Sequence, residues 1–495
     1  MKKILALILA LLMLASVLVS CKKDETDNTG TANTNQVGET GRLAELGSRD
    51  FGGETFTVLD ANDYPDMHVN YSTEETRNSS NITLALYERD IVLKELYNLN
   101  EIKYVSMTKA ANGCDAIRTN VLAGDHVYDM VTSTAVGAGS IGTLATLAVQ
   151  GMLRNLNEIN YLSLDKEWWS PLIYENMLLN DKLFFTTGDI NPSMYQAPAA
   201  MYVNMDLFNQ YHDGTDIFKI VEDGEWTLEQ LYTFSANISQ DLNEDNIMNT
   251  NDDFFGIALT KTGLTMEEFV IGSGVTFSKV ENNDLTMDLK SETLGNAIDT
   301  VKIFYPQLKY EYGGSGNDSE RQQNVINVAF KNGKAVFLAH LLEAAMFHLR
   351  DMEGDYAVLP IPKADKTQEN YLSLLNNWCD CFVSVPNSVP NDRLEFVGFM
   401  MEAMAAYSNE NLRPFIYESV LKTQRVNDPQ SSAMIDVIMD GVVIDYAIIY
   451  DVGGLSSMVV KAVLEDIPLS TQVITQKGAI NKSIKDIKTA HGIAQ

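Results

Sequence analysis

The chain has 495 residues, of which 45% are hydrophobic and 21% charged, so it is typical of a globular protein with more than one core. Its 36 basic and 67 acidic residues give a formal net charge of −31. Such a charge repels phosphate backbones and anionic lipid surfaces, which excludes nucleic acid as an expected partner.

The N-terminus has the pattern of an export signal. Lys2 and Lys3 precede an apolar run, Ile4–Val19, that is shorter than the roughly 20 residues of a membrane-spanning helix. We therefore predict that residues 1–20 are a secretory signal. The following Cys21 completes Leu-Val-Ser-Cys, which resembles the lipobox of bacterial lipoproteins. That resemblance implies acylation of Cys21 and attachment to the extracellular face of the cell membrane. An ordinary signal peptide that happens to contain a cysteine is the alternative.

Residues 21–50 are mostly polar and predict a flexible tether. After them, short apolar strands alternate with helical patterns, which indicates a parallel α/β layer. The strands expected in this part are Thr55–Leu59, Ile102–Ser106 and Tyr128–Thr132, and the helices are Ile82–Leu99, Asp115–Leu122 and Ile141–Ala148.

The rest of the chain is richer in helical patterns. The helices expected there are Trp168–Leu179, Leu228–Ser239, Leu264–Gly272, Leu294–Tyr305, Val325–Phe330, Arg393–Tyr407, Ser432–Asp445 and Ser457–Ile467. The expected strands are Ala335–Leu338, Tyr356–Leu359 and Cys381–Val385. The sequence has no internal repeat.

Cys114, Cys379 and Cys381 are the cysteines that remain besides Cys21. An odd number does not suggest a disulfide framework. Cys379 and Cys381 are two apart in a β-prone run, so their side chains point the same way, in poor geometry for a mutual bridge. We predict three buried thiols, and a bridge from Cys114 to one of the pair stays open.

A glycine motif at residues 137–142 matches GxGxxG between an expected strand and an expected helix. A dinucleotide fingerprint belongs to the first strand–helix turn and has an acidic residue about 20 positions later. Here the motif follows the third strand, and the segment after it is a polar loop. We interpret it as a turn that exposes backbone N–H groups toward a ligand.

A second motif has the spacing of an EF-hand-type calcium loop. Oxygen ligands fall at positions 1, 3, 5, 7, 9 and 12, the one at position 7 being a backbone carbonyl. The predicted ligands of a structural Ca²⁺ are Asp241, Asn243, Asp245, Ile247, Asn249 and Asp252. Asn246 replaces the usual glycine, and Asp252 replaces the usual glutamate, for which Asp253 could substitute. A solvated Asn/Asp turn is the alternative.

Signatures of catalysis are missing. The sequence contains no HExxH, no GxSxG and no Walker loop, and its six histidines are scattered singly. We therefore predict no enzymatic activity and no cofactor for chemistry. A surface-attached hydrolase built from distant carboxylates stays open as an alternative.

Several segments, in their order along the chain, resemble the extracellular solute-binding proteins of ABC importers, and most of all the carbohydrate-type, maltose-binding-protein-like class. They cover nearly all of the chain from Phe51 onward. Besides the lipobox, tether and βαβ opening, they are Val121–Asp129, Asn180–Phe185, Tyr202–Leu207, Gly224–Thr227, Asp241–Gly256, Phe330–Phe337 and Leu359–Lys363.

The resemblance implies an α/β, two-lobed periplasmic-binding-protein-like fold with hinge crossings and a helix-rich second lobe. By that pattern, residues 51–187 and 338–385 form lobe one, and residues 188–337 and 386–495 form lobe two. A hinge crossing is expected near Gly188. The resemblance further implies a monomer that binds its ligand in the cleft and delivers it to ABC permease subunits.

A cleft that binds sugar needs aromatic platforms with carboxylates and amides around them. We expect such residues in the loops after the lobe-one strands, at the hinge, after the strand at 335–338, and in the polar loop around Trp378. The predicted ligand-binding residues are Asp60, Asn62, Asp63, Ser133, Thr134, Asp189, Tyr195, Glu343 and Trp378. For Trp378, simple packing is the alternative. A peptide or other small solute as ligand, or a sensing or adhesive lipoprotein without a transporter, are alternatives to carbohydrate import.

Overall fold

The computed structural model describes residues 41–136, 143–246, 248, 251–259, 263–308, 324–379, 381–417 and 429–493. Residues Glu39–Gln495 form one compact unit. The predicted signal, Cys21, the tether up to residue 40 and the glycine motif at 137–142 lie outside the described residues. In the described part of the chain, no helix combines the length and the apolar character that crossing a membrane requires.

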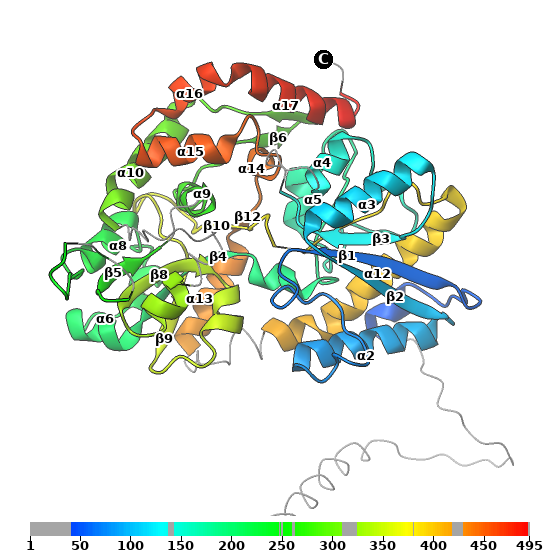
Figure 1. The fold of residues 1–495 in the computed structure, drawn as a ribbon, viewed down its shortest axis with the longest axis horizontal. Helices are drawn as coiled ribbons and strands as arrows, with labels where there is room; N and C mark the ends of the chain where they lie inside the picture. Colours follow the sequence, from blue (N-terminus) through cyan, green and yellow to red (C-terminus); the bar gives the residue numbers. More distant parts are fainter. Residues whose placement is uncertain are drawn as a thin grey trace, which may run out of the picture. The chain divides into compact units, whose positions relative to one another are not determined.

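The first sheet has the strand order β11-β3-β1-β2. Figure 1 labels β1, β2 and β3 of this sheet. Strand β1 runs parallel to β2 and β3, and β11 is antiparallel to β3. Helices α2 and α3 connect these parallel strands, as the alternating pattern predicts. The bounds are β1 Thr55–Asn62, α2 Asn81–Leu96, β2 Glu101–Thr108, α3 Ala110–Ala123, β3 Met130–Ser133 and β11 Phe382–Ser384.

The second sheet has the strand order β5-β8-β4-β9. Strand β4 is antiparallel to β8 and β9, and β5 is parallel to β8. Every residue of these four strands is buried. The bounds are β4 Ala199–Asn204, β5 Phe255–Ala258, β8 Ala335–Leu341 and β9 Tyr356–Leu359.

Helices and short strands surround the two sheets (Figure 1). Between β3 and β8 these are α4 Leu144–Val149, α5 Pro171–Met177, α6 Met205–Tyr211, α7 Ile217–Glu222, α8 Leu228–Ser235, α9 Gly263–Gly272, β6 Lys279–Glu281, β7 Asp284–Thr286, α10 Glu292–Leu308 and the π-helix Asn324–Phe330. After β9 they are β10 Ser373–Leu374, α12 Leu394–Asn411, α13 Pro429–Asp440, β12 Val442–Val443, α14 Tyr446–Ile449, α15 Leu455–Leu464, α16 Leu469–Thr475 and α17 Lys477–Ala490. Short 3₁₀ and π turns complete the list at Gly41–Glu45 (η1), Leu156–Glu158, Pro192–Gln196, Ala344–His348 and Asn391–Arg393.

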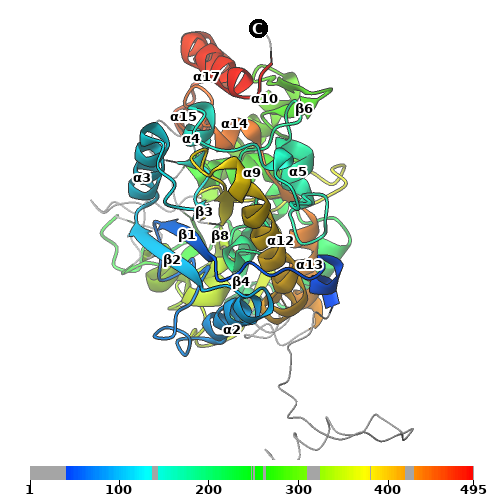
Figure 2. The same ribbon diagram turned by 90° about the vertical axis from the view of Figure 1, so that its right-hand side faces the viewer.

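Two observations differ from the predicted lobe boundaries. Residues 338–385 were expected in the first lobe, but β8 and β9 pair with β4 in the second sheet. Residues 386–495 were expected in the second lobe, but α12 packs against α2, which connects strands of the first sheet (Figure 2). The lobe to which each segment belongs depends on strand pairing and helix packing between residues far apart in the sequence. A local sequence pattern does not predict these long-range contacts.

Part of the expected tether is folded against the rest of the chain. Residues Gly41–Glu45 form η1, which packs against α12. Leu43 is buried in the core, and the Arg42 guanidinium forms an ion pair with Glu167. The backbone N–H of Arg42 also donates a 2.9 Å hydrogen bond to Glu410. Leu43 and the paired Arg42 thus hold the start of this segment against the folded body.

The helix predicted at Ser432–Asp445 is shorter than expected. Helix α13 ends at Asp440. The next residue, Gly441, packs so closely against the segment before β10 that an added Cβ would lie 2.2 Å from the carbonyl oxygen of Tyr371. The chain then forms β12, and Asp445 caps α14 by accepting hydrogen bonds from two of its backbone N–H groups. The prediction that Cys114, Cys379 and Cys381 are buried thiols is confirmed.

Candidate binding site

A cavity of about 210 Å³ lies where segments distant in sequence meet. We call it the aromatic cavity. Its wall comes from the start of α5, the expected hinge crossing, the strands β10 and β12, the end of α13 and the segment that follows α12. The lining residues are Glu167, Trp168, Trp169, Ser170, Pro171, Leu172, Gly188, Asp189, Met194, Tyr195, Pro198, Leu375, Arg413, Tyr417, Met439, Asp440 and Val442.

One wall is held in place by a buried carboxylate on α12. The indole N–H groups of Trp168 and Trp169 donate to the two oxygens of Glu402, at 2.9 and 2.8 Å, and the backbone N–H of Ser163 donates at 3.1 Å. Burial raises the pKa of Glu402 to about 7, against the opposing effect of these hydrogen bonds. Since both indoles are 1% exposed, they form a fixed wall and leave little ring surface for a ligand.

The hinge crossing runs directly against this wall. The backbone N–H of Asp189 donates a 2.9 Å hydrogen bond to the carbonyl of Trp168. Gly188 packs so closely that an added Cβ would lie 2.4 Å from that same carbonyl oxygen. A side chain at position 188 would therefore push the crossing away and change the shape of the cavity.

Asp189 and Tyr195, both predicted as ligand-binding residues, line the aromatic cavity. The hydroxyl of Tyr195 donates to one oxygen of Asp189, and the side-chain amide of Asn409 donates to the other. Burial raises the pKa of the Asp189 carboxyl, and these two hydrogen bonds partly oppose the shift. The carboxyl thus fixes the Tyr195 ring at the cavity wall.

The remaining lining combines apolar surface with charge. The rings of Tyr195 and Tyr417 meet edge to face, with centroids 6.4 Å apart. The hydroxyl of Tyr417 donates to Asp436, which fixes the ring orientation. Arg413 and Asp440 add a guanidinium and a carboxylate beside these rings. Aromatic and aliphatic surface next to charged hydrogen-bonding groups suits a ligand with C–H faces and a polar rim.

Arg413, Tyr417 and Asp440 were missed by reasoning from the sequence. They follow or end helices whose local pattern carries no sign of a binding site, and only the packing of α12 and α13 brings them to the hinge. Trp168 and Trp169 were also not among the predicted ligand-binding residues, and both are buried core residues that form the cavity wall.

Most other predicted residues lie at the ends of the first-sheet strands, outside the cavity lining, and hold loops. The Asn62 amide donates to the carbonyl of His68 at 2.6 Å and accepts from the N–H of Tyr64 at 2.8 Å. The Ser133 hydroxyl donates to the carbonyl of Ala61 at 2.8 Å.

Thr134 belongs to the same group, because its hydroxyl donates to the carbonyl of Asn377. Asp63 accepts a 3.3 Å hydrogen bond from the N–H of Ala110 at the start of α3. Asp60 is buried at 2% exposure in β1. Trp378 is 40% exposed, and its backbone N–H is held by the side chain of Asn376 at 2.8 Å.

Glu343, the remaining predicted residue, follows β8 and lies near histidines. Its Oε2 is 3.3 Å from Nε2 of His68. Burial raises the pKa of Glu343, but the hydrogen bond from His68 and the charges of His340 and His348 outweigh it, so that the pKa is below its ordinary value. The predicted set is therefore divided between the aromatic cavity and a second region that includes Glu343.

The calcium-like loop is partly described, since Ile247 and Asn249 lie outside the described residues. One oxygen of Asp241 accepts a 2.7 Å hydrogen bond from the N–H of Asn246, and Asn243 accepts one from the N–H of Asp245 at 3.1 Å. Asn246 has φ of 62°, as the glycine position of such a loop requires. The other oxygen of Asp241 is buried and has no hydrogen-bond partner among the described residues.

A scan against protein-family models and a search of curated proteins found no match. Solved structures do match. The maltose/maltodextrin-binding domain MalE from Bdellovibrio bacteriovorus, bound to maltotriose, aligns with a TM-score of 0.54 at 12% identity, over 87% of this chain and 100% of that one. The GacH receptor of Streptomyces glaucescens, solved unliganded and with acarbose, aligns with a TM-score of 0.53 at 13% identity, over 88% and 99%.

A cyclic α-maltosyl-1,6-maltose binding protein from Arthrobacter globiformis aligns with a TM-score of 0.53 at 11% identity, over 88% of this chain and 100% of that one. At such identities the likeness shows the fold. The predicted two-lobed periplasmic-binding-protein-like α/β fold is confirmed, with one lobe built on each of the two sheets.

Proposed function

We propose that this chain is an extracellular solute-binding protein that captures a carbohydrate in the aromatic cavity and delivers it to an ABC-type permease. The shared fold supports the proposal, because the three matched proteins are, by their names, sugar-binding or bound to sugars and sugar analogues. It remains a binding function, in which the solute leaves chemically unchanged.

The observation that carries the proposal is the composition of the aromatic cavity at the hinge. A sugar presents apolar C–H faces and a rim of hydroxyls. Tyr195, Tyr417 and the aliphatic lining offer surface for the faces, whereas Arg413 and Asp440 offer donors and acceptors for the rim. A peptide or a simple anion would match this combination of apolar surface and charged groups less well.

The placement of the cavity also supports closure around the solute. Trp168 and Trp169 are held by α12, which packs on the first-sheet side. Asp440 and Met439 end α13, which packs against β9 of the second sheet. A ligand that contacts both walls binds the closed state more tightly than an open one and shifts the population toward it. The closed surface is the feature that a permease can recognise.

A library of oligosaccharides, sugar acids and short peptides, screened by thermal unfolding of the mature chain, tests the proposal. We expect at least one sugar to raise the unfolding temperature in a concentration-dependent way, because a ligand that binds the native state stabilises it by mass action. The retained sugar should be recovered intact. Stabilisation by peptides alone, or cleavage of the sugar, would contradict the proposal.

We also propose that the chain is anchored by lipid at Cys21. Growth with a labelled fatty acid should label the wild-type protein in the membrane fraction. The Cys21→Ser variant should carry no label. The Cys114→Ser variant, the matched control, should be labelled like the wild type. Label that persists in Cys21→Ser would contradict the anchor.

The loop at 241–252 is proposed to bind a structural Ca²⁺. The buried oxygen of Asp241 that lacks a partner supports this, because such an oxygen loses its hydration without compensation unless a cation or water meets it. Asn243 and Asp245 supply further oxygens within the same turn.

A further inference from the structure

Three of the six histidines in the sequence gather around one buried carboxylate. His68 and His340 approach opposite oxygens of Glu343: Nε2 of His68 lies 3.3 Å from Oε2, and Nδ1 of His340 lies 3.9 Å from Oε1. The ring centroid of His348 is 6.3 Å from that of His340. We call this group, together with Cys379, the Glu343 cluster.

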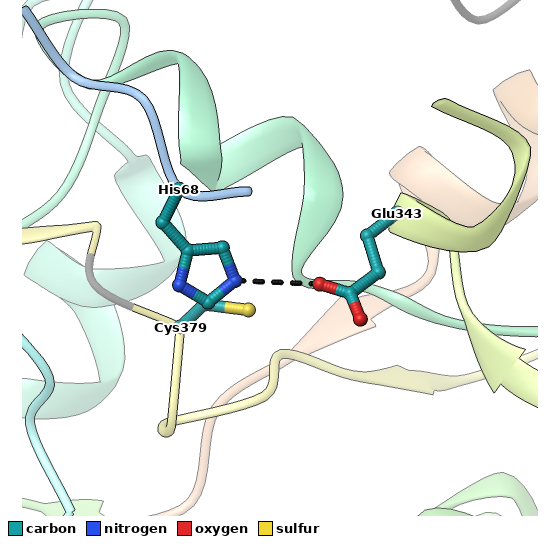
Figure 3. A group of neighbouring side chains, drawn as sticks. All are labelled: His68, Glu343 and Cys379. Atoms are coloured by element: carbon teal, nitrogen blue, oxygen red, sulfur yellow. Dashed lines mark hydrogen bonds and ion pairs between the residues drawn. The ribbon is translucent and has the colours of Figure 1, made fainter. Parts of the chain in front are cut away.

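Cys379 brings a thiol to the same place. The ligand atoms of His68, Glu343 and Cys379 all lie within 4.8 Å of one another. Figure 3 shows the imidazole, the carboxylate and the sulfur facing a common point. Ligand atoms around a tetrahedral Zn²⁺ are separated by roughly 3.3–3.8 Å, given bond lengths of about 2.0–2.3 Å. The ligand atoms therefore need to approach one another by about 1–1.5 Å at most, which rotamer adjustment can supply.

These residues are buried, which distinguishes the cluster from a solvated group of surface charges. His68 is 3% exposed, Glu343 6% and Cys379 1%. His340 is 8% exposed, and its Nδ1 is a buried nitrogen with no hydrogen-bond partner in the described part of the chain. A buried nitrogen without a hydrogen bond is costly unless something coordinates it, and a metal ion does so directly.

The ligands come from both lobes. His68 lies in the loop after β1 of the first sheet, and Cys379 lies in the segment that leads into β11 of the same sheet. His340 is part of β8 in the second sheet, and Glu343 follows that strand by two residues. An ion held by all four would tie the two sheets together.

We propose that His68, Glu343 and Cys379 bind a divalent transition-metal ion of the Zn²⁺ class. Nδ1 of His340 lies 3.9 Å from Oε1 of Glu343 but outside this group of mutually close ligand atoms, so it becomes the fourth ligand by moving toward the ion. A nitrogen, oxygen and sulfur set excludes Mg²⁺ and Ca²⁺, which take oxygen ligands, and fits Zn²⁺ or Co²⁺ in four-coordinate geometry. Because the ligands belong to both lobes, bound metal stabilises the closed arrangement and opposes its opening. The site thus links metal supply outside the cell to lobe closure.

The test uses Co²⁺ alone as a spectroscopic probe, added to the chelator-treated mature chain without sugar. We expect a thiolate-to-cobalt charge-transfer band together with the intense visible bands of tetrahedral Co²⁺, and we expect Zn²⁺ to remove both. Cys379→Ser should lose the charge-transfer band, whereas the matched controls Cys381→Ser and Cys114→Ser should keep it. His68→Gln should weaken Co²⁺ binding at least tenfold.

A wild-type chain that is folded by circular dichroism and gives no charge-transfer band would overturn the proposal. So would a band that survives Cys379→Ser, or one that disappears in either control. If Cys379→Ser does not fold, the wild-type band and the loss of affinity in His68→Gln decide the question. Because no sugar is present, the result is independent of carbohydrate binding.

Discussion

The aromatic cavity and the Glu343 cluster both lie where the two lobes meet, but they differ in what they leave open. The cavity has about 210 Å³ of space beside rings whose orientation is already fixed by Asp189 and Asp436. In the Glu343 cluster, the ligand atoms of three side chains lie within 4.8 Å of one another. The first region can accept an organic solute, whereas the second has room for an ion. Under the two proposals, these regions bind different molecules at one junction of the lobes.

The largest change in stability is expected from Glu402→Leu, which affects the wall of the aromatic cavity and not the Glu343 cluster. This change leaves two buried indole N–H groups and the N–H of Ser163 without their acceptor. We expect the free energy of unfolding to fall by about 3–5 kcal/mol, measured by urea denaturation. Glu402→Gln keeps one acceptor oxygen and should lose about half as much. A loss below about 1 kcal/mol in the leucine variant would contradict this account of the cavity wall.

Two variants, Tyr417→Ala and Trp378→Ala, test which of the two regions binds the sugar. Tyr417 lines the aromatic cavity, whereas Trp378 precedes Cys379 and is 40% exposed. With a sugar found in the library, we expect calorimetry to show roughly 10–100-fold weaker binding for Tyr417→Ala, as the loss of one aromatic platform predicts. Trp378→Ala should change affinity by less than about threefold. The reverse pattern would place the sugar at the ends of the first-sheet strands.

The pH dependence of stability tests the buried state of Glu402. Its folded pKa is about 7, raised by burial from an ordinary value of 4.5. The folded chain therefore holds this proton more tightly than the unfolded chain does. That stabilisation is complete below about pH 4.5 and is lost as the pH rises through 7, by about 3 kcal/mol. In urea denaturation, the difference in stability between wild type and Glu402→Gln should shrink by this amount from pH 4.5 to 7.5, and a constant difference would refute it.

A further effect is expected at the calcium-like loop, which belongs to neither region. Ca²⁺ at about 100 times its dissociation constant stabilises a native state by about 2.7 kcal/mol. In a chain of this length we expect a rise of about 2–5 °C in the unfolding temperature after chelator treatment. Asp241→Asn should abolish this rise, and Asp213→Asn serves as a surface control. An unchanged response in Asp241→Asn would refute the proposed ligand role.

Local pattern was sufficient for the first sheet. Thr55–Leu59 and Tyr128–Thr132 were predicted as strands because apolar, β-branched runs alternate there with helical patterns, and β1 and β3 occupy these places. Strand β4 was not predicted from its own pattern, because Ala199–Asn204 is short and begins with two alanines. Its place between β8 and β9 depends on partners more than a hundred residues away.

The candidate site was predictable in part for a similar reason. Asp189 and Tyr195 were chosen because they follow the expected hinge, and the hinge forms one wall of the aromatic cavity. Arg413 and Asp440 owe their positions to the packing of α12 and α13, which no local spacing encodes. His68, His340 and Cys379 are likewise scattered in the sequence, and the topology of two sheets brings them together.

The short helix η1 has a mechanical consequence. Its Arg42 pairs with Glu167, a residue of the cavity wall, and its backbone N–H is held by Glu410 on α12. Tension applied to the chain at Gly41 is thus carried to the wall through these contacts and through the buried Leu43. A force on the N-terminal segment would therefore reach the cavity wall. We expect the solute affinity of protein immobilised through its N-terminus to differ from that of protein free in solution.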